Sequence, residues 1–166
     1  MIIVGMDKEY IPYIRSLVGH RRVMAIGVSI TLRDKEGRYL IEKRQDDGRY
    51  CFPGGALDFD EKLIDGARRE LKEETGIEAG KLTLLALLSG KEGDFHYPNG
   101  DFTSYVTVHF LGEIACMPPL SSFQESEVKE LLLLPLDQLP PLEEFLPGDQ
   151  KVIEFLRQGK EGILVD

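Results

Sequence analysis

The chain has 166 residues, of which 42% are hydrophobic and 30% charged, and its formal net charge is −9. This size and composition fit one globular domain with a substantial core, and they exclude a wholly disordered chain. The negative charge disfavours a stable nucleic-acid partner and an anionic membrane surface. The apolar runs are too short to span a bilayer, and no basic region precedes the apolar run at the N-terminus. We therefore expect a cytoplasmic protein.

Strand and helix patterns alternate along the chain. The helix over residues 60–75 is expected to end at Gly76, because glycine readily closes a helix. Segments 89–101 and 117–127 are expected to be loops. These elements predict a single α/β or α+β domain over residues 1–166, with residues 1–19 as an N-terminal helical extension. The expected elements are a helix at 9–18, a hairpin of strands at 22–32 and 38–43, the helix at 60–75, a buried strand at 81–88, strands at 103–114 and 131–134, and a helix at 150–157.

The central helix carries three carboxylates on one side. With about 100° per residue and Glu70 set to zero, Glu74 lies at about 40° and Glu73 at about 300°. Ile64, Ala67 and Leu71 lie at about 60–120°, so the acidic sector borders the apolar stripe. Carboxylates at that border are expected at the seam between core and solvent, where a cleft can form.

Three carboxylates so close together repel one another and raise each other's pKa values. Mg²⁺ relieves that repulsion, because it binds oxygen ligands and keeps waters that a phosphate can replace. Arg69 lies four residues before Glu73 and can pair with it or orient Glu61. Gly66 is unfavourable inside a helix, so we expect another group to approach its backbone closely. The alternative is an ordinary solvated acidic face.

The neighbouring residues favour the metal-site interpretation, because their spacing resembles the Nudix box of the Nudix (MutT-like) hydrolase family. The segment Phe52-Pro53-Gly54 before it also resembles that family. The motif-quality match covers residues 48–77, with the box at residues 55–77. The positions that carry it are Gly55, Glu61, Arg69, Glu70, Leu71, Glu73, Glu74, Gly76 and Ile77.

The resemblance implies an α/β/α sandwich with a mixed central sheet. It implies a pyrophosphohydrolase that splits a nucleoside diphosphate linked to another moiety, with Mg²⁺, or Mn²⁺ in its place, as cofactor. Glu70, Glu73 and Glu74 would be metal ligands, and Gly55 would contribute its carbonyl. Glu61 and Arg69 would support the site.

The general base stays open between two sources. In some relatives it comes from the box, which would make it Glu70 here. In others a later loop supplies it, and the candidates are then Glu125, Glu127 and Glu130.

Three further side chains are candidate substrate contacts. Arg44 is placed to clamp a phosphate, or is a plain surface arginine. Tyr50 precedes the box and either stacks on substrate or packs in the core. Tyr97 lies in an aromatic run that the resemblance places near the substrate, and an Asn-Gly turn with packed aromatics explains that run equally well.

No substrate signature of the family is matched, so the sequence names no particular nucleotide. The expected partner is a small-molecule nucleotide, and a homodimer is a further expectation. Two rival functions share the fold: a non-catalytic sensor that binds a nucleotide metabolite, and more remotely an isomerase.

Overall fold

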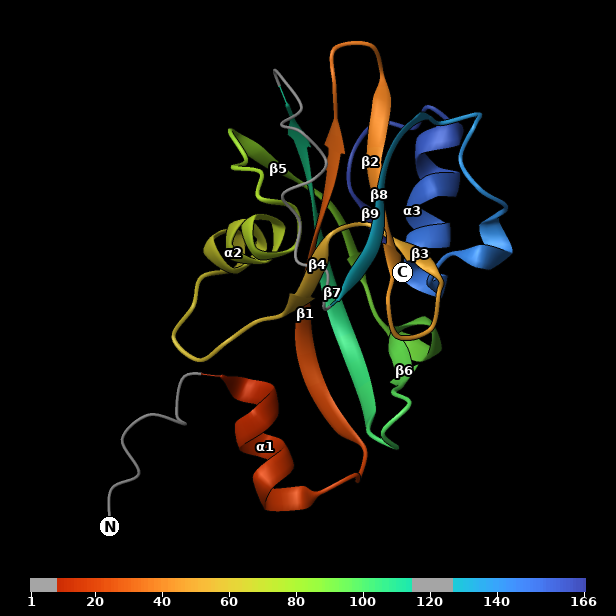
Figure 1. Cartoon of the computed structure of the whole chain (residues 1–166). Helices are drawn as coiled ribbons and strands as arrows, with labels where there is room; N and C mark the ends of the chain where they lie inside the picture. Colours follow the sequence, from red (N-terminus) through yellow and green to blue (C-terminus); the bar gives the residue numbers. More distant parts are fainter. Residues whose placement is uncertain (1–8, 115–126) are drawn as a thin grey trace.

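The computed structural model describes residues 9–114 and 127–166 (Figure 1). The candidate base Glu125 and most of the loop predicted at 117–127 lie outside the described residues. The helices are α1 (Tyr10–Val18), α2 (Leu63–Thr75) and α3 (Pro147–Arg157), with short 3₁₀ turns η1 (Gly90–Gly93) and η2 (Leu142–Glu144). The strands are β1 (Val23–Arg33), β2 (Arg38–Arg44), β3 (Tyr50–Cys51), β4 (Gly54–Ala56), β5 (Leu82–Leu88), β6 (Asp94–His96), β7 (Phe102–Glu113), β8 (Val128–Pro135) and β9 (Leu164–Val165).

The strands that are described form one mixed sheet. Its main order is β3-β2-β1-β7-β5-β9, with β4 on β1, β6 on β7 and β8 on β2. The two long central strands, β1 and β7, run parallel from the pair Val23–Thr103 to the pair Arg33–Glu113. β5 pairs with β7 in the antiparallel direction, and β9 pairs with β5 in the parallel direction. The prediction of a mixed central sheet is therefore confirmed.

Two apolar clusters pack on the sheet, one under each of the long helices. α2 contributes Ala67 and Leu71 to a cluster with central-strand residues such as Ile30. α3 contributes Val152 and Ile153 to a second cluster with β5 and the chain before α3. Both helices are amphipathic, and burial of their apolar faces drives this packing. Figure 1 shows α2 and α3 on opposite sides of the sheet, so the α/β/α sandwich is confirmed.

The hairpin predicted from strands 22–32 and 38–43 is correct only at its turn. β1 and β2 pair at Arg33 and Tyr39, next to the turn that Gly37 closes with φ 77°. Beyond that point the two strands separate, and on their facing edges β1 pairs with β4 and β2 pairs with β3. β7 and β8 pair with the other edges of β1 and β2. The prediction was wrong there because local turn chemistry does not specify which distant strand offers the better apolar partner.

Three other element predictions need correction. α2 begins at Leu63 and not at residue 60, since the preceding loop is pinned by a hydrogen bond from Asp58 N to Glu61 Oε2 (3.2 Å). The expected loop at 89–101 contains η1 and β6, which adds to the edge of β7. β5 is not fully buried, because Leu84 and Leu87 face outward.

The predicted N-terminal helix is present as α1 and ends at Gly19, where φ is 62°. Its first residue anchors it to the loop before α2, because Tyr10 N donates to Asp58 Oδ1 (3.1 Å). Its Arg15 donates to Phe102 O (2.9 Å) at the start of β7. None of the described helices has the length and apolar character needed to cross a bilayer.

Candidate active site

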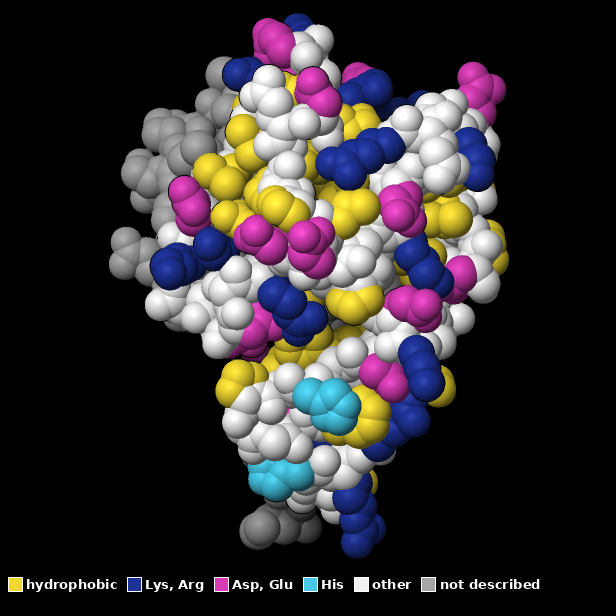
Figure 2. Space-filling model, turned by 90° about the vertical axis from the view of Figure 1, so that its right-hand side faces the viewer, with side chains coloured by type: hydrophobic (Ala, Val, Ile, Leu, Met, Phe, Trp, Pro, Cys, Tyr) yellow, Lys and Arg dark blue, Asp and Glu magenta, His cyan; other side chains and the backbone are white. Residues whose placement is uncertain are grey.

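A cleft opens beside the C-terminal half of α2, where the strand–loop–helix segment β4–α2 faces β2 and α1. It encloses about 720 Å³, within the size range of small-molecule sites. Eight acidic and two basic side chains line it. On the α3 side of the molecule, by contrast, Lys and Arg alternate with Asp and Glu (Figure 2). The lining acids are Glu9, Glu42, Asp46, Asp58, Glu70, Glu73, Glu74 and Glu127, and the bases are Arg44 and Arg69.

The three carboxylates of the helix reach this cleft together, as the wheel predicts. Glu74 is buried beside the apolar stripe, and its Oε2 accepts a hydrogen bond from Gly54 N (2.8 Å). The side chain of Glu70 is 13% exposed and that of Glu73 50% exposed. The acidic sector therefore runs from the core to solvent.

Burial is the main influence on the charge of these groups. It raises the pKa of Glu70 to about 7, although the charge of Arg69 opposes the rise. Burial also raises the pKa of Glu74 well above its usual range, and the nearby Glu42 and Glu70 carboxylates add to this. Carboxylates held this way resist ionisation until a cation compensates them.

Arg69 connects the acidic groups of the cleft. Its guanidinium donates to Glu70 Oε1 (2.8 Å), to Glu73 Oε2 (3.2 Å) and to the carbonyl oxygen of Ala56 (3.1 Å). It also binds both oxygens of Glu61 and lowers the pKa of that carboxyl. Both pairings considered for Arg69, with Glu73 and with Glu61, are thus present.

Two glycines allow this close packing. A Cβ on Gly55 would lie 2.5 Å from Glu70 Oε1, so only glycine leaves the carboxylate its place. A Cβ on Gly66 would lie 2.7 Å from Leu57 Cδ1 and 2.8 Å from Glu61 Oε2. The close approach expected at Gly66 is confirmed, and it comes from the loop that carries Glu61.

The chemistry of the cleft fits a divalent cation. Its donors are carboxylate and carbonyl oxygens, which Mg²⁺ and Mn²⁺ bind. Because Gly55 has no Cβ, it leaves room for the Glu70 carboxylate at the cleft. Buried Glu42 adds an oxygen, Oε2, that has no hydrogen-bond partner. In the part of the chain that the structure describes, no three such side chains are arranged closely enough to bind one cation together. Arg69 donates hydrogen bonds to Glu70 and Glu73, and Gly54 N donates to Glu74.

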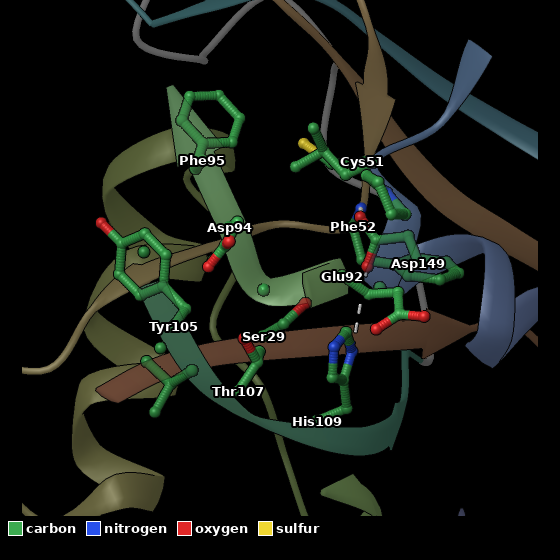
Figure 3. Close-up of a pocket in the computed structure, with 18 of the residues that line it drawn as sticks. Ser29, Cys51, Phe52, Glu92, Asp94, Phe95, Tyr105, Thr107, His109 and Asp149 are labelled. Carbon is green, nitrogen blue, oxygen red and sulfur yellow. Dashed lines mark hydrogen bonds and ion pairs between the residues drawn. The ribbon is translucent and has the colours of Figure 1, made fainter. Parts of the chain in front are cut away.

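A second pocket adjoins the cleft. Arg44, Gly54, Gly55 and Tyr97 line both, so the two form one continuous depression. The walls of the pocket come from β1, β3, β6, β7 and the start of α3, and Figure 3 shows its polar and aromatic side chains gathered around a common space. A ligand that fills both would extend from the acidic cleft into this pocket.

Of the predicted substrate contacts, Arg44 and Tyr97 lie at this junction and Tyr50 does not. Arg44 donates to both oxygens of Asp46 and lies over the ring of Phe95. The Tyr97 hydroxyl bonds that of Tyr105 (2.8 Å). Tyr50 is buried against Phe145 in the cluster under α3, because the strand alternation turns its ring away from the cleft.

The structure separates the later-loop candidates for a general base. Glu127 lines the cleft. Glu130 is exposed on β8 opposite Lys43 and does not line it. Glu125 lies outside the described residues.

Sequence reasoning missed three buried polar residues at the site, namely Glu42, His109 and Asp149. Glu42 faces the cleft, and His109 and Asp149 face the pocket. A charged residue within an apolar strand was the available signal for Glu42, which lies between Ile41 and Lys43. Asp149 follows Pro147-Gly148, which opens α3, and it resembles an ordinary N-terminal helix residue.

A model of the NUDIX domain matches residues 23–156, which is most of the chain and runs from β1 to the penultimate residue of α3. The chain belongs to the Nudix family. Members of this Nudix family generally use divalent metal ions.

Individual similarities are partial. A MutT-like protein from Streptomyces ambofaciens is 39% identical over 61 residues, 36% of this chain and 40% of that protein. An RNA pyrophosphohydrolase from Novosphingobium aromaticivorans is 37% identical over 62 residues, 36% of this chain and 38% of that protein. The Nudix chain thus spans less than half the length of these curated relatives. The crystal structure of a MutT Nudix hydrolase from Burkholderia pseudomallei superposes with a TM-score of 0.64 at 24% identity, covering 80% of this chain and 97% of the other.

Proposed function

We propose that this Nudix protein is a pyrophosphohydrolase that cleaves a phosphoric anhydride bond in a nucleoside diphosphate linked to another moiety, with Mg²⁺ as cofactor. The observation that carries the proposal is the acidic cleft opening into a mixed apolar and polar pocket. Eight acids in the cleft would repel a diphosphate, so the substrate must enter with a cation. The names of the partly matched relatives, MutT-like protein and RNA pyrophosphohydrolase, agree with this chemistry.

Glu70, Glu73, Glu74 and the carbonyl of Gly55 would hold the cation. When bound, a divalent cation neutralises the diphosphate and makes its phosphorus more electrophilic. Arg69 keeps Glu61 and Glu70 in position through the hydrogen bonds described above. Arg44 lies where cleft and pocket meet, and we assign it to the diphosphate oxygens in exchange for Asp46.

In the hydrolytic step a water oxygen forms a bond to phosphorus, and the bridging P–O bond breaks. We assign the general base to Glu127, which lines the cleft. Glu70 is less suited to this role, because it accepts a hydrogen bond from Arg69. Glu127 accepts the water proton, and the products are a nucleoside monophosphate and a phosphorylated second moiety.

The test is hydrolysis of a panel containing ADP-ribose, dinucleoside polyphosphates, CDP-alcohols and oxidised deoxynucleoside triphosphates, with Mg²⁺, Mn²⁺ or EDTA and with product identification. We expect metal-dependent release of a nucleoside monophosphate from at least one substrate. The Glu74→Gln variant should lose activity by about 100-fold or more, on the scale of lost site electrostatics. It keeps an oxygen for Gly54 N, so its circular dichroism should stay unchanged.

Glu78→Gln is the matched control, because Glu78 is exposed and paired with Lys72 away from the cleft. It should retain wild-type rates. Full activity in Glu74→Gln, or no hydrolysis anywhere in the panel, would overturn the proposal. Tight binding of a nucleotide without turnover would identify a sensor instead.

A further inference from the structure

The strand β2 contributes one carboxylate to the acidic cleft, on the side that faces α2. Glu42 is only 3% exposed, and it lines the cleft together with Glu70 and Glu74. Side chains alternate along a strand, so Glu42 faces the same side of the sheet as Leu40, which packs in the apolar cluster under α2. An apolar side chain at this position would extend that cluster, but the chain has a charged one instead.

One oxygen of this carboxylate has a partner and the other does not. Cys51 pairs with Glu42 in the ladder between β2 and β3, and its Sγ donates to Glu42 Oε1 (3.3 Å). Glu42 Oε2 is buried and has no hydrogen-bond partner among the described residues. Protonation does not remove this deficit, because a hydroxyl at Oε2 would then lack an acceptor. Buried polar atoms are normally paired, so Oε2 indicates a ligand that binds there.

The neighbouring charges decide what kind of ligand this is. Burial raises the pKa of Glu42 to about 7, and the charges of Glu127 and Glu70 add to the rise, although the Cys51 thiol and Arg44 oppose it. The guanidinium of Arg44 donates its hydrogen bonds to Asp46 and not to Glu42. A cation would relieve the repulsion between these carboxylates, and a hard divalent ion prefers their oxygens.

We propose that Glu42 is a further ligand of the divalent cation, contributed by β2 from across the cleft through its Oε2 atom. The cation would then join the strand wall of the cleft to the helix wall that carries Glu70 and Glu74. Glu42 lies outside the Nudix box at residues 55–77, so the spacing of the box does not imply this role. The inference rests on the proposed function only for the presence of a cation in the cleft.

The role of Glu42 also predicts how metal changes stability. A buried carboxylate with an unpaired oxygen and acidic neighbours destabilises the folded chain until a cation compensates it. In Glu42→Gln the side chain keeps its length and an oxygen for the Cys51 thiol, and its NH₂ can donate to the neighbouring carboxylates. In EDTA this variant should melt at the same temperature as the wild type or higher. It should gain less than the wild type from added Mg²⁺ or Mn²⁺.

The experiment is isothermal titration calorimetry of the whole protein with Mn²⁺ alone, at neutral pH and without nucleotide. We expect Glu42→Gln to bind Mn²⁺ at its tightest site about 10-fold more weakly than the wild type, or worse, because even groups that only orient metal ligands contribute this much to affinity. Equal Mn²⁺ affinity in the wild type and in folded Glu42→Gln would overturn the inference, as would a wild type that binds no Mn²⁺.

Glu36→Gln is the matched control. Glu36 lies in the turn before β2, is 68% exposed, pairs with Arg38 and does not line the cleft. This variant should therefore keep the Mn²⁺ affinity of the wild type. A loss equal to that of Glu42→Gln would show that any lost negative charge weakens binding, and it would overturn the role of Glu42 as a ligand.

A second measurement uses the wild type and needs no folded variant. The side-chain carboxyl ¹³C resonance of Glu42 should shift in NMR spectra when Mg²⁺ is added, together with those of Glu70 and Glu74. A Glu42 resonance that stays in place at saturating Mg²⁺ would overturn the inference.

The inference and the proposed function can fail separately. Hydrolysis of the substrate panel with unchanged Mn²⁺ affinity in Glu42→Gln would leave the proposed function standing and remove this ligand. Weakened Mn²⁺ affinity in that variant, with no hydrolysis anywhere in the panel, would keep the ligand and remove the proposed function.

Discussion

Arg69 donates two hydrogen bonds to Glu61, from Nε to Oε1 (2.8 Å) and from Nη2 to Oε2 (3.0 Å). The two residues are eight positions apart, one on α2 and one in the loop before it. The bidentate pair ties the loop to the helix, and the remaining Nη1 then holds Glu70 and Glu73. A supporting residue of the box thus sets the position of the carboxylates that line the cleft.

Arg69→Lys should damage the site even though it keeps the charge. A lysine ammonium cannot form the paired hydrogen bonds to Glu61 while also reaching Glu70. We expect a fall of about 1–2 kcal/mol in the free energy of unfolding, measured by urea denaturation, with a loss of hydrolysis of about 10-fold or more. Arg68→Lys is the control, because exposed Arg68 does not line the cleft and donates to the Gly80 carbonyl. Wild-type activity in Arg69→Lys would contradict this role.

Gly66→Ala should destabilise the protein, although alanine is the better helix former. The added Cβ would meet Leu57 and Glu61 at less than 3 Å, so the loop must move away from Arg69. We expect a loss of about 1–3 kcal/mol in thermal or urea unfolding. In Gly148→Ala the nearest atom, Leu88 Cδ1, is 3.7 Å away, so that variant should be neutral or more stable. Equal effects of the two substitutions would refute the steric explanation.

Asp149→Asn should stabilise the protein more at high pH than at low pH. Burial raises the pKa of Asp149 from 3.8 to about 7, with Glu42 adding to the rise and Arg44 opposing it. Between these pH values the carboxyl stays protonated in the native state and ionises in the unfolded state. The free energy of unfolding of the wild type therefore falls as pH rises to about 7. Above it the native state carries the full cost of a buried anion.

The asparagine variant avoids that cost and keeps an oxygen for Phe52 N. About three pKa units at 1.36 kcal/mol each give an upper limit on the order of 4 kcal/mol. Urea denaturation at pH values near 5 and 8 measures the difference between variant and wild type. If Asp149→Asn stabilised the protein less near pH 8 than near pH 5, the prediction would be contradicted.

Glu127→Gln should lower kcat without changing the fold. Glu127 lines the cleft and is assigned as the base, and loss of such a group costs about 10²–10⁴-fold. Glu130→Gln should stay within about 2-fold of wild type, since that residue lies on β8 opposite Lys43. If Glu127→Gln keeps the wild-type kcat, the assignment of the base to Glu127 is wrong and Glu70 becomes the candidate.

The helix that carries Glu70, Glu73 and Glu74 was predictable, because its periodicity depends only on local geometry. The sequence also indicated the end of that helix at Gly76, whose φ is 73°. The start of the helix was not predictable to the residue, since the hydrogen bond from Asp58 N to Glu61 Oε2 pins the loop before it.

The sequence by itself determined the carboxylate pattern, its supporting arginine and the layered α/β class, since each follows from spacing along one segment or from apolar periodicity. Only the tertiary structure decided that β1 pairs with β7 and β2 with β8, that Tyr50 faces the core, and that Glu127 reaches the cleft. It also brought His109 and Asp149, forty positions apart, within 4.0 Å. Such contacts depend on how distant apolar faces pack, and that information is not contained in any single segment.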